Sequence, residues 1–226
     1  MTPQIEIELK ELKSEIINMW RLVRSQLAKT YDAVINFDKD LAHEVVLREK
    51  RVNAYELKID RDCENIFALY TPVAIDLRFV LAVLKINNNL ERIGDIAEGV
   101  ARYIIESPVP FTKELLEKTE MLKMYKEALS ILVDTLEAFE TEDTTLARSI
   151  FHKDEFLNQI NVQANKLLSN AIKSNIEFTD EAMYILSIIR KIERVGDQCT
   201  NIAEETIFYI EAKVLKHQRK KEKEGE

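Results

Sequence analysis

The sequence is poor in the residues that break regular structure and in those that most often carry out catalysis. Its 226 residues include four glycines, four prolines, three histidines and two cysteines. So few glycines and prolines cannot supply the turns of a many-stranded β protein, and long helices are expected instead. General acid–base catalysis has little material with three histidines. The chain also has no glycine-rich phosphate loop and no serine or cysteine in a glycine elbow.

Further absences concern membranes, disulfides and nucleic acids. No apolar run approaches the roughly 20 residues that span a bilayer, and no basic segment followed by an apolar one begins the chain. No signal peptide is therefore expected, and the predicted location is cytoplasmic. Cys63 and Cys199 lie far apart in sequence and form no Cys-x-x-Cys pair. They are therefore expected to be free, buried thiols in a reducing compartment. The net charge of −8 argues against broad nucleic-acid binding and favours cations.

What the sequence does contain is a long helical pattern. Apolar residues make up 46% and charged residues 32%, as in folded globular proteins. Apolar side chains recur every three or four residues, which indicates one buried stripe per helix. The expected helices span about residues 5–37, 41–69, 72–106, 115–139, 144–175 and 178–216. Thr71, directly before Pro72, is expected to be the N-cap of the third.

Short loops between long helices favour antiparallel neighbours. A proline-containing break at 107–111 separates three helices from three. The predicted fold is all-α, with two pseudo-repeated antiparallel three-helix bundles at 1–107 and 111–216. The charged tail at 217–226 has little to bury and is expected to fray.

An internal repeat supports this division. Glu-Arg-Ile-Gly-Asp at 91–95 recurs as Glu-Arg-Val-Gly-Asp at 193–197, 102 residues further along. A weaker echo lies one helix earlier, where an acid is followed four residues later by an asparagine, at 49–53 and again at 154–158. Self-similarity at this spacing indicates duplication of a three-helix unit.

The repeated motif carries two local penalties in each copy. Its two acids stand four residues apart and share one helix face, where like charges repel. Its glycine lies within a helix, where it costs about 1 kcal/mol relative to alanine. A bound cation would compensate, because carboxylates on facing helices can hold metal ions and a glycine lets the neighbouring helix approach. The predicted metal ligands are Glu91, Asp95, Glu193 and Asp197, with Glu49, Asn53, Asp154, Asn158 and Asn201 as contributors.

Three other interpretations of these acids are open. The acids could belong to salt bridges on a solvated face, although adjacent residues such as Glu91 and Arg92 point away from each other on a helix. A metal-free helical adaptor would share the fold. A di-iron carboxylate enzyme would need Glu-x-x-His on two helices, a motif that the sequence lacks. The further acid pair Glu56 and Asp60 is predicted to be a solvated face, since its second copy is missing.

The motifs also resemble a known family. Residues 90–95, preceded by Asp-Leu-Arg at 76–78, resemble the first half of PhoU proteins, bacterial regulators of phosphate signalling. Residues 192–197, followed by Asn-Ile-Ala-Glu at 201–204, resemble the second half. The resemblance covers nearly the whole chain.

This resemblance implies two similar three-helix bundles with multinuclear metal sites and no enzymatic activity. Iron is the expected metal, with manganese, magnesium and zinc as alternatives. It implies repression of phosphate-starvation genes through two partners, the ATPase of the phosphate ABC transporter and a membrane sensor histidine kinase. Through these partners the protein would be held at the membrane surface. The oligomeric state is open, and a homodimer is one alternative. Asn53 and Asn158 depart from the family's acidic pattern, which should weaken metal binding.

Overall fold

A computed structural model describes residues 3–215 and confirms an all-helical protein. The first three helices are α1 (Pro3–Asn36), α2 (Lys39–Tyr70) and α3 (Ala74–Glu106). The second half contains α4 (Lys113–Lys118), α5 (Met121–Thr141), α6 (Thr144–Ser174), the short 3₁₀ helix η1 (Ile176–Phe178) and α7 (Thr179–Glu211). None of these helices combines the length and the hydropathy needed to cross a membrane. The predicted tail at 217–226 lies outside the described residues.

The second helix of each half begins in the same way. Asp38 caps α2 by accepting a hydrogen bond from the backbone N–H of Leu41, at 2.9 Å. Asp143 caps α6 by accepting from the backbone N–H groups of Thr145 and Leu146. An aspartate at this position satisfies N–H groups that have no partner within the helix. The duplication therefore extends to the helix caps.

Two predicted helix boundaries are wrong. Thr71 does not cap α3; it ends α2 in a left-handed conformation with φ of 47°, and α3 begins at Ala74 after Val73. The expected fourth helix is divided into α4 and α5 at Glu120, whose φ is 55°. Directly after α4, the Thr119 hydroxyl donates to the Leu115 carbonyl and closes the last turn of that helix. The left-handed residue then redirects the chain so that the apolar sides of both helices are buried.

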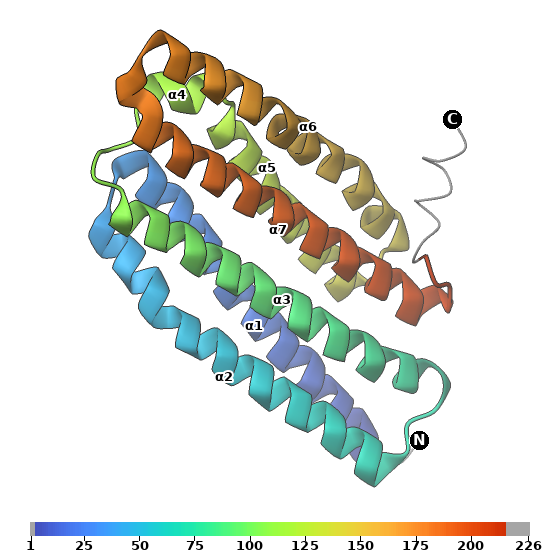
Figure 1. Ribbon diagram of the computed structural model, residues 1–226. Coiled ribbons are helices and arrows are strands. Elements are labelled where there is room, and N and C mark those ends of the chain that lie inside the picture. The colour runs from blue at the N-terminus through green and yellow to red at the C-terminus, as the bar shows by residue number, and fades with distance from the viewer. Residues whose placement is uncertain (1–2, 216–226) are drawn as a thin grey trace, which may run out of the picture.

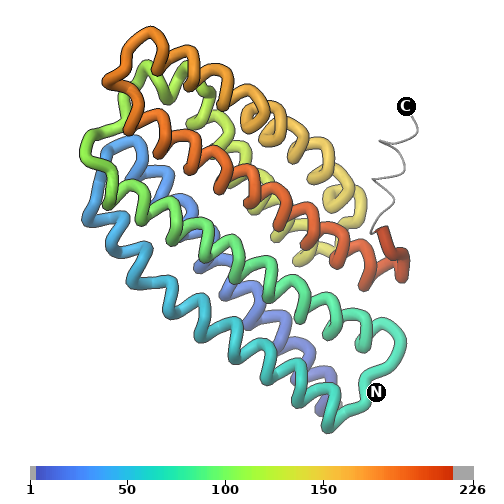
Figure 2. The backbone as a smooth tube through the Cα atoms, viewed as in Figure 1, coloured from blue at the N-terminus to red at the C-terminus, as the bar shows by residue number. Residues whose placement is uncertain are grey.

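The two halves lie side by side, with α3 and α7 in contact along their length (Figure 1, Figure 2). They run antiparallel, because Tyr184 near the start of α7 donates to the Glu106 carbonyl at the end of α3. Aromatic side chains from both halves meet in one core, where the Phe79 ring lies 6.3 Å from Phe139 and 5.7 Å from Tyr209. The hydrophobic core is thus continuous across the repeat, and the division at 107 and 111 stays a prediction from sequence.

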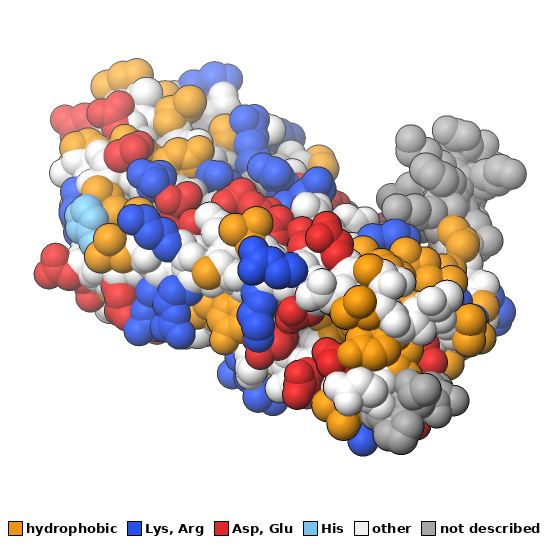
Figure 3. Space-filling view, turned by 90° about the horizontal axis from the view of Figure 1, so that it is seen from below, with side chains coloured by type: hydrophobic (Ala, Val, Ile, Leu, Met, Phe, Trp, Pro, Cys, Tyr) orange, Lys and Arg blue, Asp and Glu red, His pale blue; other side chains and the backbone are white. Residues whose placement is uncertain are grey.

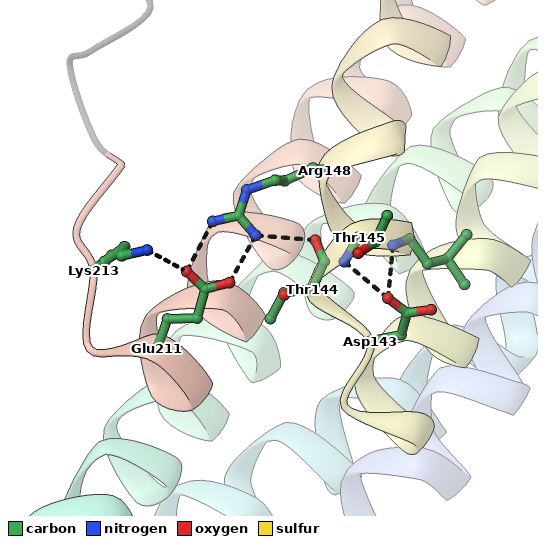
Figure 4. A network of polar contacts seen from close by, with 7 residues as sticks. Asp143, Thr144, Thr145, Arg148, Glu211 and Lys213 are labelled. Carbon is green, nitrogen blue, oxygen red and sulfur yellow. Dashed lines mark hydrogen bonds and ion pairs between the residues drawn. The ribbon is translucent and has the colours of Figure 1, made fainter.

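A polar network joins the start of α6 to the end of α7 (Figure 4). Arg148 on α6 donates to both carboxylate oxygens of Glu211 on α7, at 2.8 and 2.9 Å. Arg148 also donates to the Thr144 carbonyl, and Lys213 forms an ion pair with Glu211 at 3.0 Å. These contacts hold the C-terminal end of α7 against the start of α6.

Candidate functional site

Both glycines of the repeated motif lie where a neighbouring helix comes close. A Cβ added to Gly94 on α3 would lie 3.0 Å from Cγ1 of Val52 on α2. A Cβ added to Gly196 on α7 would lie only 2.3 Å from Oδ1 of Asp154 on α6. The predicted role of these glycines is therefore confirmed. Both glycines let the third helix of each half pack closely against the second helix. At Gly196 the missing side chain also leaves room for Asp154, a candidate metal ligand.

The weak echo between the halves corresponds to a shared arrangement. Glu49 and Asp154 are both buried, with 8% and 6% of their surface exposed. Asn53 donates to Glu49 at 2.8 Å, and Asn158 donates to Asp154 at 3.2 Å. Each asparagine thus orients the acid four residues before it. Burial of a carboxylate is unfavourable without a compensating charge or hydrogen bonds.

In the first half, the predicted acids lie close enough to influence one another. Burial raises the pKa of Glu91 to about 7, and the negative charge of Asp95 acts in the same direction. Glu56 and Glu49 contribute further, whereas Arg92 opposes the rise. Burial also raises the pKa of Glu49, followed by the charge of Asp95. The α2–α3 hairpin therefore brings Glu49 level with Glu91, as predicted.

Glu56 is half-buried and lies near this acidic group, closer to it than the predicted solvated face implied. Burial, then the charges of Asp60 and Asp95, raise the pKa of Glu56. Asp60 is directed elsewhere, because it accepts a hydrogen bond from Asn87 at 2.8 Å. The sequence did contain a signal: Glu56 follows Glu49 by seven residues, which puts both on one helix face. Glu98 on α3, also missed, adds its charge near Glu49.

The second half repeats the group with fewer acids. Burial raises the pKa of Glu193, and the charges of Asp197 and Asp154 act in the same direction. Asn161 stands where the first half has Glu56, 105 residues earlier. A hydrogen bond from Asn161 lowers the pKa of Glu193. The two sites therefore share a plan but differ in charge.

Asn201, the remaining predicted contributor, also contacts the other half of the molecule. Its side-chain amide donates to Asn89 on α3 at 3.4 Å. The helix that faces Glu193 is α6, which contributes Asp154 and Asn161. Asn201 thus joins the two halves of the molecule.

The salt-bridge interpretation does not account for the three glutamates of these groups. Within residues 3–215, none of Glu49, Glu91 and Glu193 forms an ion pair with a basic side chain. The side chains of His43 and His152, on α2 and α6, are exposed. The di-iron enzyme interpretation therefore gains no ligands from the fold.

The residues present suit a metal in their chemistry. One oxygen of Glu49, Oε1, is buried with no hydrogen-bond partner in the described part of the chain. Such an atom is unfavourable unless something completes its interactions, and the donors around it are the oxygens that hard cations prefer. As they lie, no three Asp, Glu, His or Cys side chains within residues 3–215 converge on a point that could hold an ion. The ligand types fit, and their final arrangement would require side-chain rotation.

Comparisons with known proteins agree with this geometry. The model of the PhoU domain matches the chain twice, over residues 16–104 and 121–206. The phosphate-specific transport system accessory protein PhoU of Edwardsiella tarda is 32% identical over 95% of this chain and 87% of its own.

Two solved structures share the fold. The crystal structure of PhoU from Pseudomonas aeruginosa matches with a TM-score of 0.83 and 28% identity, over 92% of this chain and 99% of that one. The crystal structure of the phosphate transport system regulatory protein PhoU from Streptococcus pneumoniae matches with a TM-score of 0.82 and 28% identity, over 93% of this chain and 99% of that one. The matched domain covers both acidic groups and both three-helix units, and the chain therefore belongs to the PhoU family.

Proposed function

We propose that this protein is a metal-binding regulator of phosphate uptake and phosphate-starvation signalling that works through protein contacts and has no enzymatic activity of its own. Its relatives carry the name of accessory proteins of the phosphate-specific transport system, which supports the phosphate role. The observation that supports metal binding best is the buried, unpartnered Glu49 Oε1 beside the acids of α3.

Each half would hold metal between its second and third helices. In the first half the ligands would be Glu49, Glu91 and Asp95, with Glu56 added from the structure. In the second half they would be Asp154, Glu193 and Asp197. Asn53 and Asn158 would hold the buried acids in place. Iron is the expected metal, with manganese, magnesium or zinc as alternatives. The ion would supply positive charge that relieves carboxylate repulsion.

The proposed partners are the ATPase of the phosphate ABC transporter and a membrane sensor histidine kinase, met in the cytoplasm. Large apolar side chains are exposed around the α2–α3 turn, where Leu69 and Val73 are 71% and 67% exposed. Ile75 and Leu77 continue this patch onto α3. Figure 3 shows hydrophobic side chains gathered toward the end of the molecule where α2 meets α3. An exposed apolar patch of this kind suits a protein partner, and we assign it to the transporter ATPase.

Metal content tests the first part. Protein purified without a metal-affinity tag should contain iron or another transition metal by elemental analysis, and added metal should raise the melting temperature of stripped protein. Replacing Glu91 and Asp95 together with alanine should remove metal from the first site and leave the second loaded. Glu106→Ala, an exposed acid on the same helix, is the matched control. Equal loss from both sites would contradict separate sites in each half.

A pull-down against the transporter ATPase and the sensor kinase tests the second part. Leu69→Asp should reduce capture of the ATPase without lowering the melting temperature, because Leu69 is largely exposed. Protein that captures both partners but neither contains nor is stabilised by metal would instead be the metal-free adaptor.

A further inference from the structure

A cavity of about 350 Å³ lies between α3 and α7, where the two halves of the molecule meet. Its basic lining residues are Arg92 and Arg102 from α3 and Lys191 and Arg194 from α7. We propose that this cavity binds a small anion that carries a phosphoryl group. Its size is at the lower end of small-ligand pockets, roughly 300–1,000 Å³. The site lies outside the proposed metal ligand sets except at Asp95, which borders both.

The cavity is basic on a protein whose net charge is −8. Four cationic side chains line it, against the two carboxylates of Asp95 and Glu98. Arg102 is neutralised by an ion pair with Glu98, at 2.6 Å. Within residues 3–215, Arg92 and Arg194 form no such pair, so both guanidinium groups remain available. The excess of two positive charges matches a phosphate dianion.

The internal duplication explains how these cations meet. Arg92 and Arg194 occupy the same position in the two copies of the repeated motif. Since α3 and α7 run antiparallel and Asn89 contacts Asn201 across the seam, the middles of both motifs are brought level. Each half thus contributes a guanidinium, which can donate two parallel hydrogen bonds to phosphoryl oxygens.

The absence of a side chain at Gly99 leaves room for Lys191 at the cavity. A Cβ at Gly99 would lie 2.3 Å from Nζ of Lys191, so the ammonium group rests directly against the α3 backbone. The same Nζ lies 5.5 Å from the centre of the Tyr103 ring, a cation–π contact that holds it there. The equivalent position in the second copy is Asn201, so the duplication itself does not call for a glycine. Gly99 is explained by the placement of Lys191.

The two carboxylates add selectivity. At neutral pH a phosphate group can carry a proton, which Asp95 or Glu98 can accept in a hydrogen bond. Sulfate has the same shape and charge but no proton to donate. The cavity should therefore bind phosphate more tightly than sulfate.

Calorimetric titration of protein stripped of metal with a chelator tests this directly. Inorganic phosphate, pyrophosphate and ATP are the probes, and sulfate is the shape-matched control. We expect saturable binding of at least one probe, weakened about tenfold or more by Arg92→Gln or Arg194→Gln. Arg190→Gln is the matched control, because Arg190 lies one turn earlier on α7 and donates to Asn165 on α6. Binding of phosphate alone would indicate the free ion, and binding only of the larger probes a phosphorylated metabolite.

Gly99→Ala separates ligand binding from folding. The added methyl group would displace the flexible end of Lys191, while alanine favours the helix. The melting temperature should hold or rise while anion affinity falls. Three results would overturn the proposal: no saturable binding of any probe, sulfate binding as tight as that of the tightest probe, or equal weakening by Arg190→Gln. Because the titration uses metal-free protein, failure of metal binding would leave its outcome unchanged.

Discussion

Single residues account for the difference between the two glycine positions of the repeat. Gly94 faces the side chain of Val52, whereas Gly196 faces a carboxylate oxygen of Asp154. The sequence predicted that both glycines admit the neighbouring helix, and the repetition of the motif sufficed for that. It could not predict which atom fills the space, because this depends on the rotation of α2 and α6 about their axes.

Gly196→Ala should disrupt the second site more than Gly94→Ala disrupts the first. The new methyl group at 196 would lie 2.3 Å from Asp154 Oδ1 and force that buried carboxylate out of position. We expect destabilisation of about 1–3 kcal/mol, as for other overpacked sites, and loss of metal from the second half only. Denaturant unfolding and elemental analysis measure the two effects. Wild-type metal content in Gly196→Ala would show that Asp154 is not a ligand.

The two cysteines are predicted to be unreactive in the folded protein. Burial is the main cause that raises the pKa of both thiols to about 12, well above the usual range. At pH 8 the reactive thiolate is therefore scarce, and each side chain is fully enclosed.

Labelling of native protein with a thiol reagent at pH 8 should be slow and limited by unfolding, whereas protein in denaturant should react at once at both cysteines. Cys63→Ser and Cys199→Ser would each leave one thiol to follow. Rapid labelling of either single-cysteine variant in the native state would contradict the burial described above.

At the scale of helices, contacts between side chains set helix boundaries that the apolar periodicity could not predict. The apolar periodicity predicted one continuous helix over residues 115–139, but the chain turns at Glu120. That turn depends on the Thr119 hydroxyl and on burial of Leu115 and Met121 against other helices. Such tertiary contacts are invisible in a local pattern. Thr71 before Pro72 matched a capping signal, yet the α2–α3 turn required a left-handed residue there.

The contact between α6 and α7 should depend on pH through Glu211. Hydrogen bonds from Arg148, then Thr144, lower the pKa of this carboxyl below its usual value of 4.5. A lowered pKa means that the charged form is favoured by folding. Its stabilisation is therefore fully present above pH 4.5 and is lost as the pH falls below that value.

Glu211→Gln should consequently lower the melting temperature slightly at pH 7, and the difference from wild type should shrink in acid. Circular dichroism across pH 3–7 measures this. Glu106→Gln, which removes an exposed acid without an ion pair in residues 3–215, serves as control. If the difference in melting temperature between Glu211→Gln and wild type grew as the pH fell, the lowered pKa of Glu211 would be contradicted.

At the scale of the whole molecule, the sequence predicted two units but not how they join. Its repeat identified equivalent positions in each half, and these are confirmed by the matching caps and acid–asparagine pairs. The aromatic contacts among Phe79, Phe139 and Tyr209 could not be predicted, because no repeated spacing links them. The basic cavity between α3 and α7 arises only from this joining.

Duplication followed by divergence leads to a last prediction, that the two metal sites bind with unequal strength. The first half contributes Glu49, Glu56, Glu91 and Asp95, whereas Asn161 in the second half takes the place of Glu56. Affinity for a hard cation rises with the number of carboxylates around it. In a chelator titration the second half should therefore release metal first.

Exchanging the residue types at positions 56 and 161 should reduce the difference in metal affinity between the two sites. Glu56→Gln should weaken the first site and Asn161→Glu strengthen the second, each on the order of tenfold. Glu64→Gln, an exposed acid later on α2, should change neither. Because Glu56 and Asn161 differ in charge while their backbone positions correspond, the exchange tests carboxylate number directly. Equal affinities in the wild type, or a second site unaffected by Asn161→Glu, would show that something other than charge sets the strength of metal binding.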